Sequence, residues 1–303
     1  MADEAALERH RTAVRVRLRA ASMTRPGPGS VSWQINREIV VVAAWGRAIL
    51  LQLAHPLVAA GVDAHSGFRA SLPASLARLR STVGAMLSLT FGGDDDAIAT
   101  AARINRIHDH VFGHLEQAAG AFPAGATYSA HDADLLCWVH TTLLDSMPRV
   151  YEQLVGPLTP EQRDRYCAES AVMEPLLDIP SGLLPRGAAA VDAHMRDVLA
   201  GGRLTVTDGS RAMGRAVLFP PRWRCFWPAF RPVQLLSIGL LPEPIRHAYG
   251  FAWTRSDARA LARWTMALRM LHRMMPAVVT TWPSSRRRGR AAPGSSVSPE
   301  TVT

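Results

Sequence analysis

The sequence predicts an all-α protein, a single-domain helical bundle, and three observations support this fold class. Apolar residues recur at spacings of three and four over most of the chain, which is the period of an amphipathic helix. Glycine and proline clusters separate these segments. No sustained alternation of apolar and polar residues indicates a strand, so the pattern favours packed helices.

The expected elements follow in chain order. Residues 1–22 have the pattern of a short basic amphipathic helix, and 23–35, which contain Pro-Gly-Pro-Gly-Ser, that of a linker. Three carboxylates beginning at Asp94 suit the first turn of a helix, and Thr159 followed by Pro160 suits another helix start. Helices are expected near 36–54, 56–65, 74–91, 94–118, 132–154, 159–177, 187–200, 210–219, 231–240 and 255–275.

The chain divides into an N-terminal basic helix and linker (1–35), a helical domain (36–282) and a C-terminal tail (283–303). The tail is rich in arginine, serine and proline, so order is expected to end after about residue 282.

One apolar stretch, Ile39 to Val62, is long enough to span a bilayer. Arg47 and the His55-Pro56 pair interrupt it, which favours a helix buried in protein. The proline should end or kink that helix near His55.

Composition excludes several classes of function. The 303 residues carry 34 basic and 25 acidic side chains, a net charge of +9, and every basic residue is arginine. Without lysine there is no Schiff-base chemistry and no P-loop lysine. Aromatic residues make up 7% and form no ladder with basic residues, so no nucleic-acid partner is expected. The arginine-rich termini could make weak contact with a membrane surface.

The cysteines and the N-terminus favour a cytoplasmic location. Cys137, Cys167 and Cys225 are odd in number and contain no CxxC spacing, which argues against a disulfide framework or a zinc site. The chain begins acidic and lacks the apolar region of a secretory signal.

Helical phase singles out one histidine of the segment 94–118. In a continuous helix, Ile104 and Leu115 share an apolar face, together with Ile107, Val111 and Phe112, and His108 lies inside that face. His110 and His114 lie on the opposite side. We therefore expect His108 alone of these three to project into the core.

His140 is placed in the same way, among Leu136, Val139, Leu143, Leu144 and Met147. A buried imidazole needs a partner, because an unpaired buried polar group costs about 1–3 kcal/mol. A backbone carbonyl, a carboxylate, another histidine and a metal remain alternatives. No HExxH, GxGxxG, GxxxxGK[ST] or GxSxG motif is present.

Arg78, Ser81 and Thr82 lie on one side of the helix expected over 74–91, at spacings of three and four. Thr82 lies at the border of the apolar face, which suits either a residue that lines a pocket or a solvated helix rim.

Four motifs occur in an order and spacing that resembles a known family. They read QLAHPLVAAGVDAHS (52–66), ARLRSTVGAMLSLTFG (77–92), RINRIHDHVFGH (103–114) and YSAHDADLLCWVHTTLLDS (128–146), and RHAYGFAW (246–253) follows. Together these segments, over about residues 36–253, resemble the MpaB / latex-clearing-protein (rubber oxygenase) family of haem-binding α-helical oxygenases.

The resemblance implies a haem-dependent oxygenase, an oxidoreductase with a b-type haem whose iron is held by His108. The family's arginine and threonine positions fall on Arg78 and Thr82, which would line the haem pocket. His140 is a candidate for contact with the iron ligand or with the haem edge, His55 and His65 are the next candidate ligands, and Asp63 is a candidate base. The implied partners are O₂ and an apolar small molecule.

The sequence departs from the family at one position. Some rubber oxygenases have a lysine just before the threonine, and this chain has Ser81, a far poorer iron ligand. The distal iron position is then expected to be open or water-bound, and rubber itself becomes a less suitable substrate. Two alternatives remain at this stage: a haem protein that acts as a peroxidase or sensor, and a cofactor-free helical interaction protein.

Overall fold

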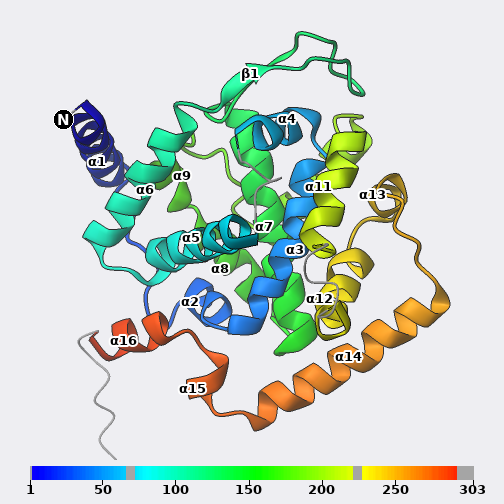
Figure 1. Cartoon of the computed structure of the whole chain (residues 1–303). Coiled ribbons are helices and arrows are strands. Elements are labelled where there is room, and N and C mark those ends of the chain that lie inside the picture. Colours follow the sequence, from blue (N-terminus) through cyan, green and yellow to red (C-terminus); the bar gives the residue numbers. More distant parts are fainter. Residues whose placement is uncertain (1, 66–71, 221–226, 292–303) are drawn as a thin grey trace, which may run out of the picture.

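The computed structural model describes residues 2–65, 72–220 and 227–291, and it describes the side chains in these ranges except those of 2–3, 72–79, 227–229 and 290–291. Nearly all regular structure there is helical (Figure 1), which confirms the predicted all-α class. The arginine-rich end of the tail (292–303) and Cys225 lie outside the described residues.

The elements of the first half are α1 Ala2–Ala21, α2 Val31–Asn36, η1 Ile39–Ala43, α3 Ala44–Leu53, α4 Pro56–His65, α5 Leu72–Phe91, α6 Asp94–His108, β1 Phe112–His114 and β2 Thr127–Ser129. The elements of the second half are α7 Ala133–Leu154, α8 Pro160–Ser170, α9 Met173–Leu177, α10 Ala188–Ala200, α11 Asp208–Leu218, α12 Trp227–Gly239, α13 Glu243–Ala248, α14 Arg255–Met274, α15 Ala277–Thr280 and α16 Pro283–Ala291.

Helix α7 runs through the middle of the bundle (Figure 1) and packs against α3, α10 and α14. Of its predicted apolar face, Leu136, Leu144 and Met147 are buried, whereas Val139 and Leu143 are half-buried. Thr141 and Thr142, which lie off that face, are fully buried too. The single apolar stripe therefore underestimates the burial of α7, because neighbouring helices cover it on several sides.

A buried ion pair joins α3 to α7. Nη1 of Arg47 lies 2.5 Å from Oδ2 of Asp145, and both side chains are almost inaccessible to solvent. The Arg47 guanidinium also donates to the Leu240 carbonyl and to Oγ of Ser146, each at 2.7 Å. Arg149, one turn along α7, donates to the other Asp145 oxygen at 2.6 Å. Burial lowers the pKa of Arg47, and the charge of Asp145 opposes that change.

The interrupted apolar stretch breaks at its proline as predicted, but the single helix expected over 36–54 is wrong: α2 ends at Asn36, the short 3-10 helix η1 follows, and α3 begins at Ala44. Helix α3 ends at Leu53 and α4 begins at Pro56, because proline cannot continue the hydrogen-bond pattern of the preceding turn. Among the described residues no single helix is long and apolar enough to cross a bilayer. The segments Ile39–Leu53 and Pro56–His65 reach the length and apolar composition of a membrane span only when they are taken together, and the angle between them is 107°.

The helix predicted over 94–118 is wrong in its second half. Helix α6 ends at His108, and the chain then forms strand β1, which pairs antiparallel with β2. Two residues assigned to the apolar face, Ile107 and Phe112, are 54% and 64% exposed. His110 and His114 are exposed, as expected.

The reason for the strand is a close contact across this hairpin. A Cβ atom on Gly113 would lie 2.6 Å from the hydroxyl oxygen of Tyr128, so glycine is required there. Glycine and the preceding aromatic Phe112 both weaken a helix, and pairing with β2 satisfies their backbone groups instead. The apolar spacing alone does not contain this information.

Smaller differences also arise. The helix expected over 159–177 is two helices, α8 and α9, although Thr159 and Gln162 form the expected N-terminal cap of α8. The linker 23–35 contains the start of α2, and α16 lies in the segment where order was expected to end. Ser285 of α16 is buried, so packing supports this short helix.

The buried ion pair gives a stability prediction. Asp145→Leu leaves the Arg47 charge in the core without a counter-ion and is expected to lower the free energy of unfolding by about 3–5 kcal/mol. Arg47→Leu should cost less, because Arg149 still neutralises Asp145. Urea denaturation should show that the double variant is clearly more stable than the sum of the two single effects implies.

Arg163→Leu, at an exposed ion pair, is the control and should lower the free energy of unfolding by less than about 1 kcal/mol. Additive single effects would contradict the prediction.

Candidate functional site

His108 is the last residue of α6, and a buried contact fixes that end of the helix. Asn105, one turn earlier, is 1% exposed and donates from Nδ2 to the Leu176 carbonyl of α9 at 3.0 Å. The His108 side chain is half-buried, and its buried Nδ1 atom has no hydrogen-bond partner among the described residues. Burial lowers the pKa of His108 to about 4, and the charge of His131 adds to this effect. At neutral pH the ring is therefore uncharged and keeps a lone pair that can bind a metal.

A hydrogen-bonded group of three residues adjoins His108. The Asp109 carboxylate accepts hydrogen bonds from Nε2 of His10 at 2.7 Å and from Nε2 of His131 at 2.8 Å. The ring of His131 stands edge-on to that of His108, with centroids 5.8 Å apart. Burial alone would raise the pKa of Asp109, but the two imidazole hydrogen bonds hold it below its ordinary value.

No sequence pattern predicted this group of three residues. His10 is 99 residues from Asp109, and His131 is 22 residues from it. No local pattern connects three such positions, because the contacts depend on α1 packing against α6 and on the hairpin that returns the chain to α7. A histidine directly before the helix cap at Asp132 was the single available signal.

His140 of α7 is the second histidine that helical phase selected. Its side chain is half-buried, and burial lowers its pKa to about 4. The charge that His108 would carry contributes to this lowering. The structure thus brings the two predicted core histidines, which come from different helices, close enough to influence each other electrostatically.

His55 and His65 lie at opposite ends of α4. Ten residue steps separate them, which corresponds to about 15 Å of helix, so one iron atom cannot bind both. His55 is 5% exposed, its Nδ1 atom has no partner among the described residues, and its ring lies 5.1 Å from that of Phe122. The exposed His65 places Nδ1 3.2 Å from the Gly61 carbonyl of its own helix.

The remaining predicted residues are less enclosed. Asp63 lies on the exposed side of α4, and Ser81 and Thr82 are exposed on α5. The neighbouring face of α5 turns inward, because Val83 and Met86 line a narrow gap against η1 and α3. Arg78 belongs to α5, but its side chain lies outside the described part of the chain.

The histidines are the candidate holders of a metal group. The described residues contain no set of three or more His, Cys, Asp or Glu side chains placed to hold a metal ion. A haem iron needs only one or two side-chain ligands, so a haem site does not require such a set. The uncharged His108 ring, with a buried nitrogen that has no partner, fits the requirement for one such ligand.

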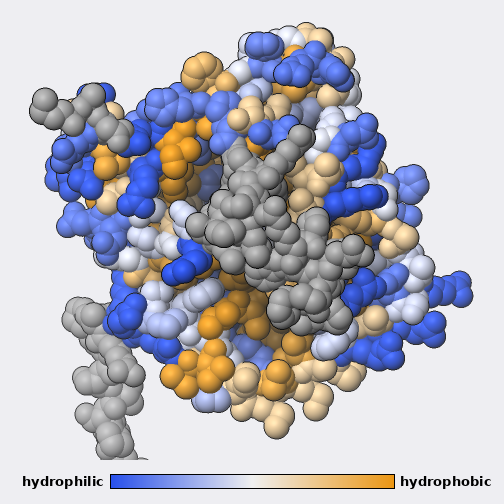
Figure 2. All heavy atoms as spheres, viewed as in Figure 1, coloured by the Kyte–Doolittle hydropathy of each residue, from blue (hydrophilic) through white to orange (hydrophobic). Residues whose placement is uncertain are grey.

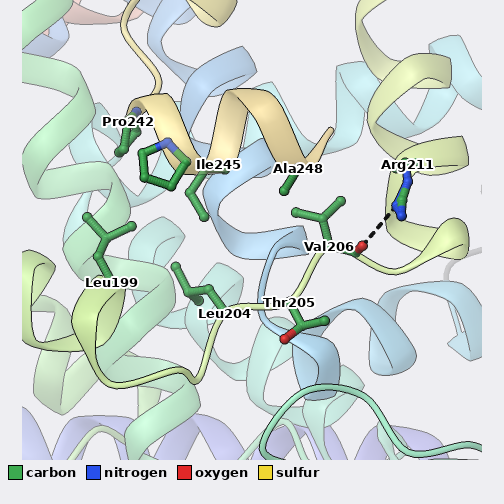
Figure 3. A pocket seen from close by; sticks show the side chains of 9 residues that line it. Leu199, Leu204, Thr205, Val206, Arg211, Pro242, Ile245 and Ala248 are labelled. Carbon is green, nitrogen blue, oxygen red and sulfur yellow. Dashed lines mark hydrogen bonds between the residues drawn. The ribbon is translucent and has the colours of Figure 1, made fainter. Parts of the chain in front are cut away.

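A separate pocket of about 420 Å³ lies elsewhere in the bundle (Figure 3). It lies between the end of α10, the start of α11 and α13, where Leu199, Leu204 and Ile245 supply apolar walls. Nη1 of Arg211 donates to the Val206 carbonyl at 3.1 Å beside it. None of the described lining residues is among the predicted site residues.

The fold and the site define an all-helical protein in which two half-buried histidines are uncharged at neutral pH. A comparison with protein-family models assigns the class more closely. The model described as "ER-bound oxygenase mpaB/B'/Rubber oxygenase, catalytic domain" matches residues 33–270, and the chain belongs to this family. The resemblance seen in the four sequence motifs is thereby confirmed, and the protein contains an oxygenase catalytic domain. No curated protein and no solved structure gave a significant match.

The burial of His55 predicts a pH-dependent stability. Burial, followed by the charge of Arg203, lowers its pKa to about 4, against the opposing influence of Asp132 and Asp134. Between its ordinary pKa and about 4 the unfolded chain binds a proton that the folded chain does not. The free energy of unfolding should therefore fall on acidification, at most by about 1.4 kcal/mol per pH unit for this residue.

Urea denaturation between about pH 7 and pH 5 measures this dependence. His55→Asn should reduce the slope of stability against pH, whereas His110→Asn, at an exposed histidine, should leave it unchanged. Equal slopes in the His55 variant and the wild type would show that His55 does not titrate in this way.

Proposed function

We propose that the protein is a b-type haem-dependent oxygenase that uses O₂ to oxidise an apolar organic substrate, with His108 as the protein ligand to iron. The observation that carries this proposal is the state of His108. Its imidazole is uncharged at neutral pH, and a buried ring nitrogen has no partner among the described residues. A cofactor bound at this nitrogen would give it a partner, and a buried polar atom without a partner lowers the stability of a folded protein.

A bound haem would supply iron for the binding and activation of O₂, whereas the protein supplies access, polarity and orientation. His108 would hold the iron from the end of α6. Asp109 and His131 would keep the chain next to that ligand in place, because their 2.8 Å hydrogen bond links the end of α6 to the start of α7. His140 would contact the cofactor or its surroundings as an uncharged group.

Helix α5 would contribute residues to the haem pocket. Ser81 is a poor iron ligand, so it would leave a bound haem accessible to O₂ or water. Arg78 would interact with a haem propionate or with oxygen through charge-assisted hydrogen bonds, and Thr82 would lie beside it. Asp63 of α4 is proposed as a base in the same pocket, and His55 and His65 as residues along its edges.

An apolar substrate is supported by the surroundings of His55 and His65, whose rings contact Phe122 and Tyr128. These two aromatic residues pack with Leu57, Leu115 and Leu135 in one apolar cluster that joins α4, the hairpin and α7. Apolar walls of this kind suit a hydrophobic molecule better than a charged one.

The ligand assignment predicts the spectra of single variants. Protein produced with a haem supply should show a Soret absorption band, and His108→Gly should lose the band because the iron loses its ligand. Added imidazole should restore it in that variant, since a free imidazole can enter the space that the side chain leaves.

His110→Gly and His114→Gly are matched controls, because both residues are exposed and close in sequence. They should keep the wild-type spectrum. If His140→Gly loses the band and His108→Gly keeps it, the ligand assignment is wrong. If the wild-type protein shows no Soret band, the haem proposal fails altogether.

Arg78 gives a second spectroscopic prediction. Arg78→Ala should keep the helical circular dichroism of the wild type but change haem occupancy or the position of the Soret band. Arg80→Ala, at an exposed position on the same helix, is the control and should change neither. Unaltered spectra and oxygen reactivity in Arg78→Ala would show that this part of α5 is a solvated rim.

Oxygen consumption separates an oxygenase from other haem proteins. The haem-loaded protein should consume O₂ when given apolar candidates such as lipids, terpenoids or polyketides, and products should contain oxygen from ¹⁸O₂. Substrate oxidation that requires peroxide would instead identify a peroxidase.

A further inference from the structure

The C-terminal helices carry a concentrated apolar surface. Of the thirteen large apolar side chains that are exposed among the described residues, eight lie between residues 264 and 279. Met266 is 67% exposed and Met274 is 81% exposed. We call this surface the α14–α15 face, and it consists of Trp264, Met266, Met270, Leu271, Met274, Met275, Val278 and Val279. Exposed apolar surfaces of such density commonly mark contact with a partner or a membrane.

The face lies on the outside of the bundle. Helices α14, α15 and α16 follow one another along one edge of the molecule (Figure 1), and α14 contains no buried residue. Figure 2 shows apolar side chains gathered along the same edge, over α15 and the end of α14. Helix α14 packs on α12 and α7 by one side, and the described residues of its other side are exposed.

The charge around this face has one sign. Between residues 258 and 299 the sequence contains eight arginines and no acidic residue. Arg259, Arg263 and Arg273 of α14 are exposed and form no ion pair with any described residue. Arg286 of α16 donates a hydrogen bond to the Val278 carbonyl, which places a further cation beside the apolar side chains.

The helical repeat puts both properties on one side of α14. Positions 259, 263, 266, 270 and 274 follow at spacings of three and four, so they form a single outward row. Arginines occupy the first half of the row and methionines the second half. Twenty residues of helix make this side about 30 Å long. Arginine side chains can extend their charged ends toward phosphates while their stems stay in apolar surroundings.

We propose that the α14–α15 face docks on an anionic lipid bilayer, with α14 lying in the plane of the interface. An apolar side rimmed by arginines is typical of helices that bind at membrane surfaces, where acidic headgroups attract the cations. A second copy of the chain is a poorer occupant, because a symmetric dimer through this face would bring the same unpaired arginines together. The proposal is independent of the haem assignment.

Sedimentation with lipid vesicles tests the proposal on the full chain. The protein should pellet with vesicles that contain phosphatidylcholine and phosphatidylglycerol, at least tenfold more strongly than with phosphatidylcholine alone, and high salt should weaken the binding. The triple variant M266S/M270S/M274S should lose at least nine tenths of the binding. R259Q/R263Q/R273Q should lose the preference for the anionic vesicles.

Val16→Ser is the matched control, because Val16 is 59% exposed on α1 and distant in sequence from α14; its binding should equal that of the wild type. Unaltered circular dichroism would establish that all variants are folded. Wild-type protein that ignores anionic vesicles, or a methionine variant that binds as well as the wild type, would overturn the proposal. So would a dimer in light scattering that the methionine substitutions convert to a monomer.

Discussion

The buried ion pair between Arg47 and Asp145 is the constraint on which the rest of the bundle depends, because it fixes α3 against α7. A charge in the core must meet its counter-ion closely, and the 2.5 Å contact allows one register between the two helices. Arg47 also reaches the Leu240 carbonyl beyond α12, so a single side chain aligns three segments. The cost of removing two charges from water offsets much of their attraction, so the pair adds little net stability compared with apolar residues of similar size.

The geometry of the candidate site follows from this alignment. With α7 fixed, His140 has a set position, and the hairpin before α7 brings His131 to Asp109 and to the end of α6. Helix α4 leaves α3 at a bend of 107°, which carries it across to the hairpin. The position of the site therefore depends on three features: the register of α3 against α7, the bend at Pro56 and the hairpin of β1 and β2.

Elements that depend mainly on short-range interactions, such as most helices and their ends, could be predicted from the sequence. The spacing of apolar residues predicted most helices, and Pro56 predicted the break after α3. The same spacing predicted that His108 and His140 point toward the core. The apolar spacing predicted a helix where the chain forms a strand at Gly113, because there a tertiary contact with the ring of Tyr128 determines the conformation. It also could not show that Asp109 binds a histidine 99 residues away, because that contact requires the finished fold.

Helix α1 is part of the folded unit. It precedes the segment 33–270 that the family model covers, yet Val14 is fully buried in a cluster with α6 and α9. His10 of the same helix binds the residue next to His108. A recombinant fragment trimmed to the family boundary would therefore expose an apolar surface and loosen the end of α6. The smallest fragment that keeps the site intact must retain the first helix.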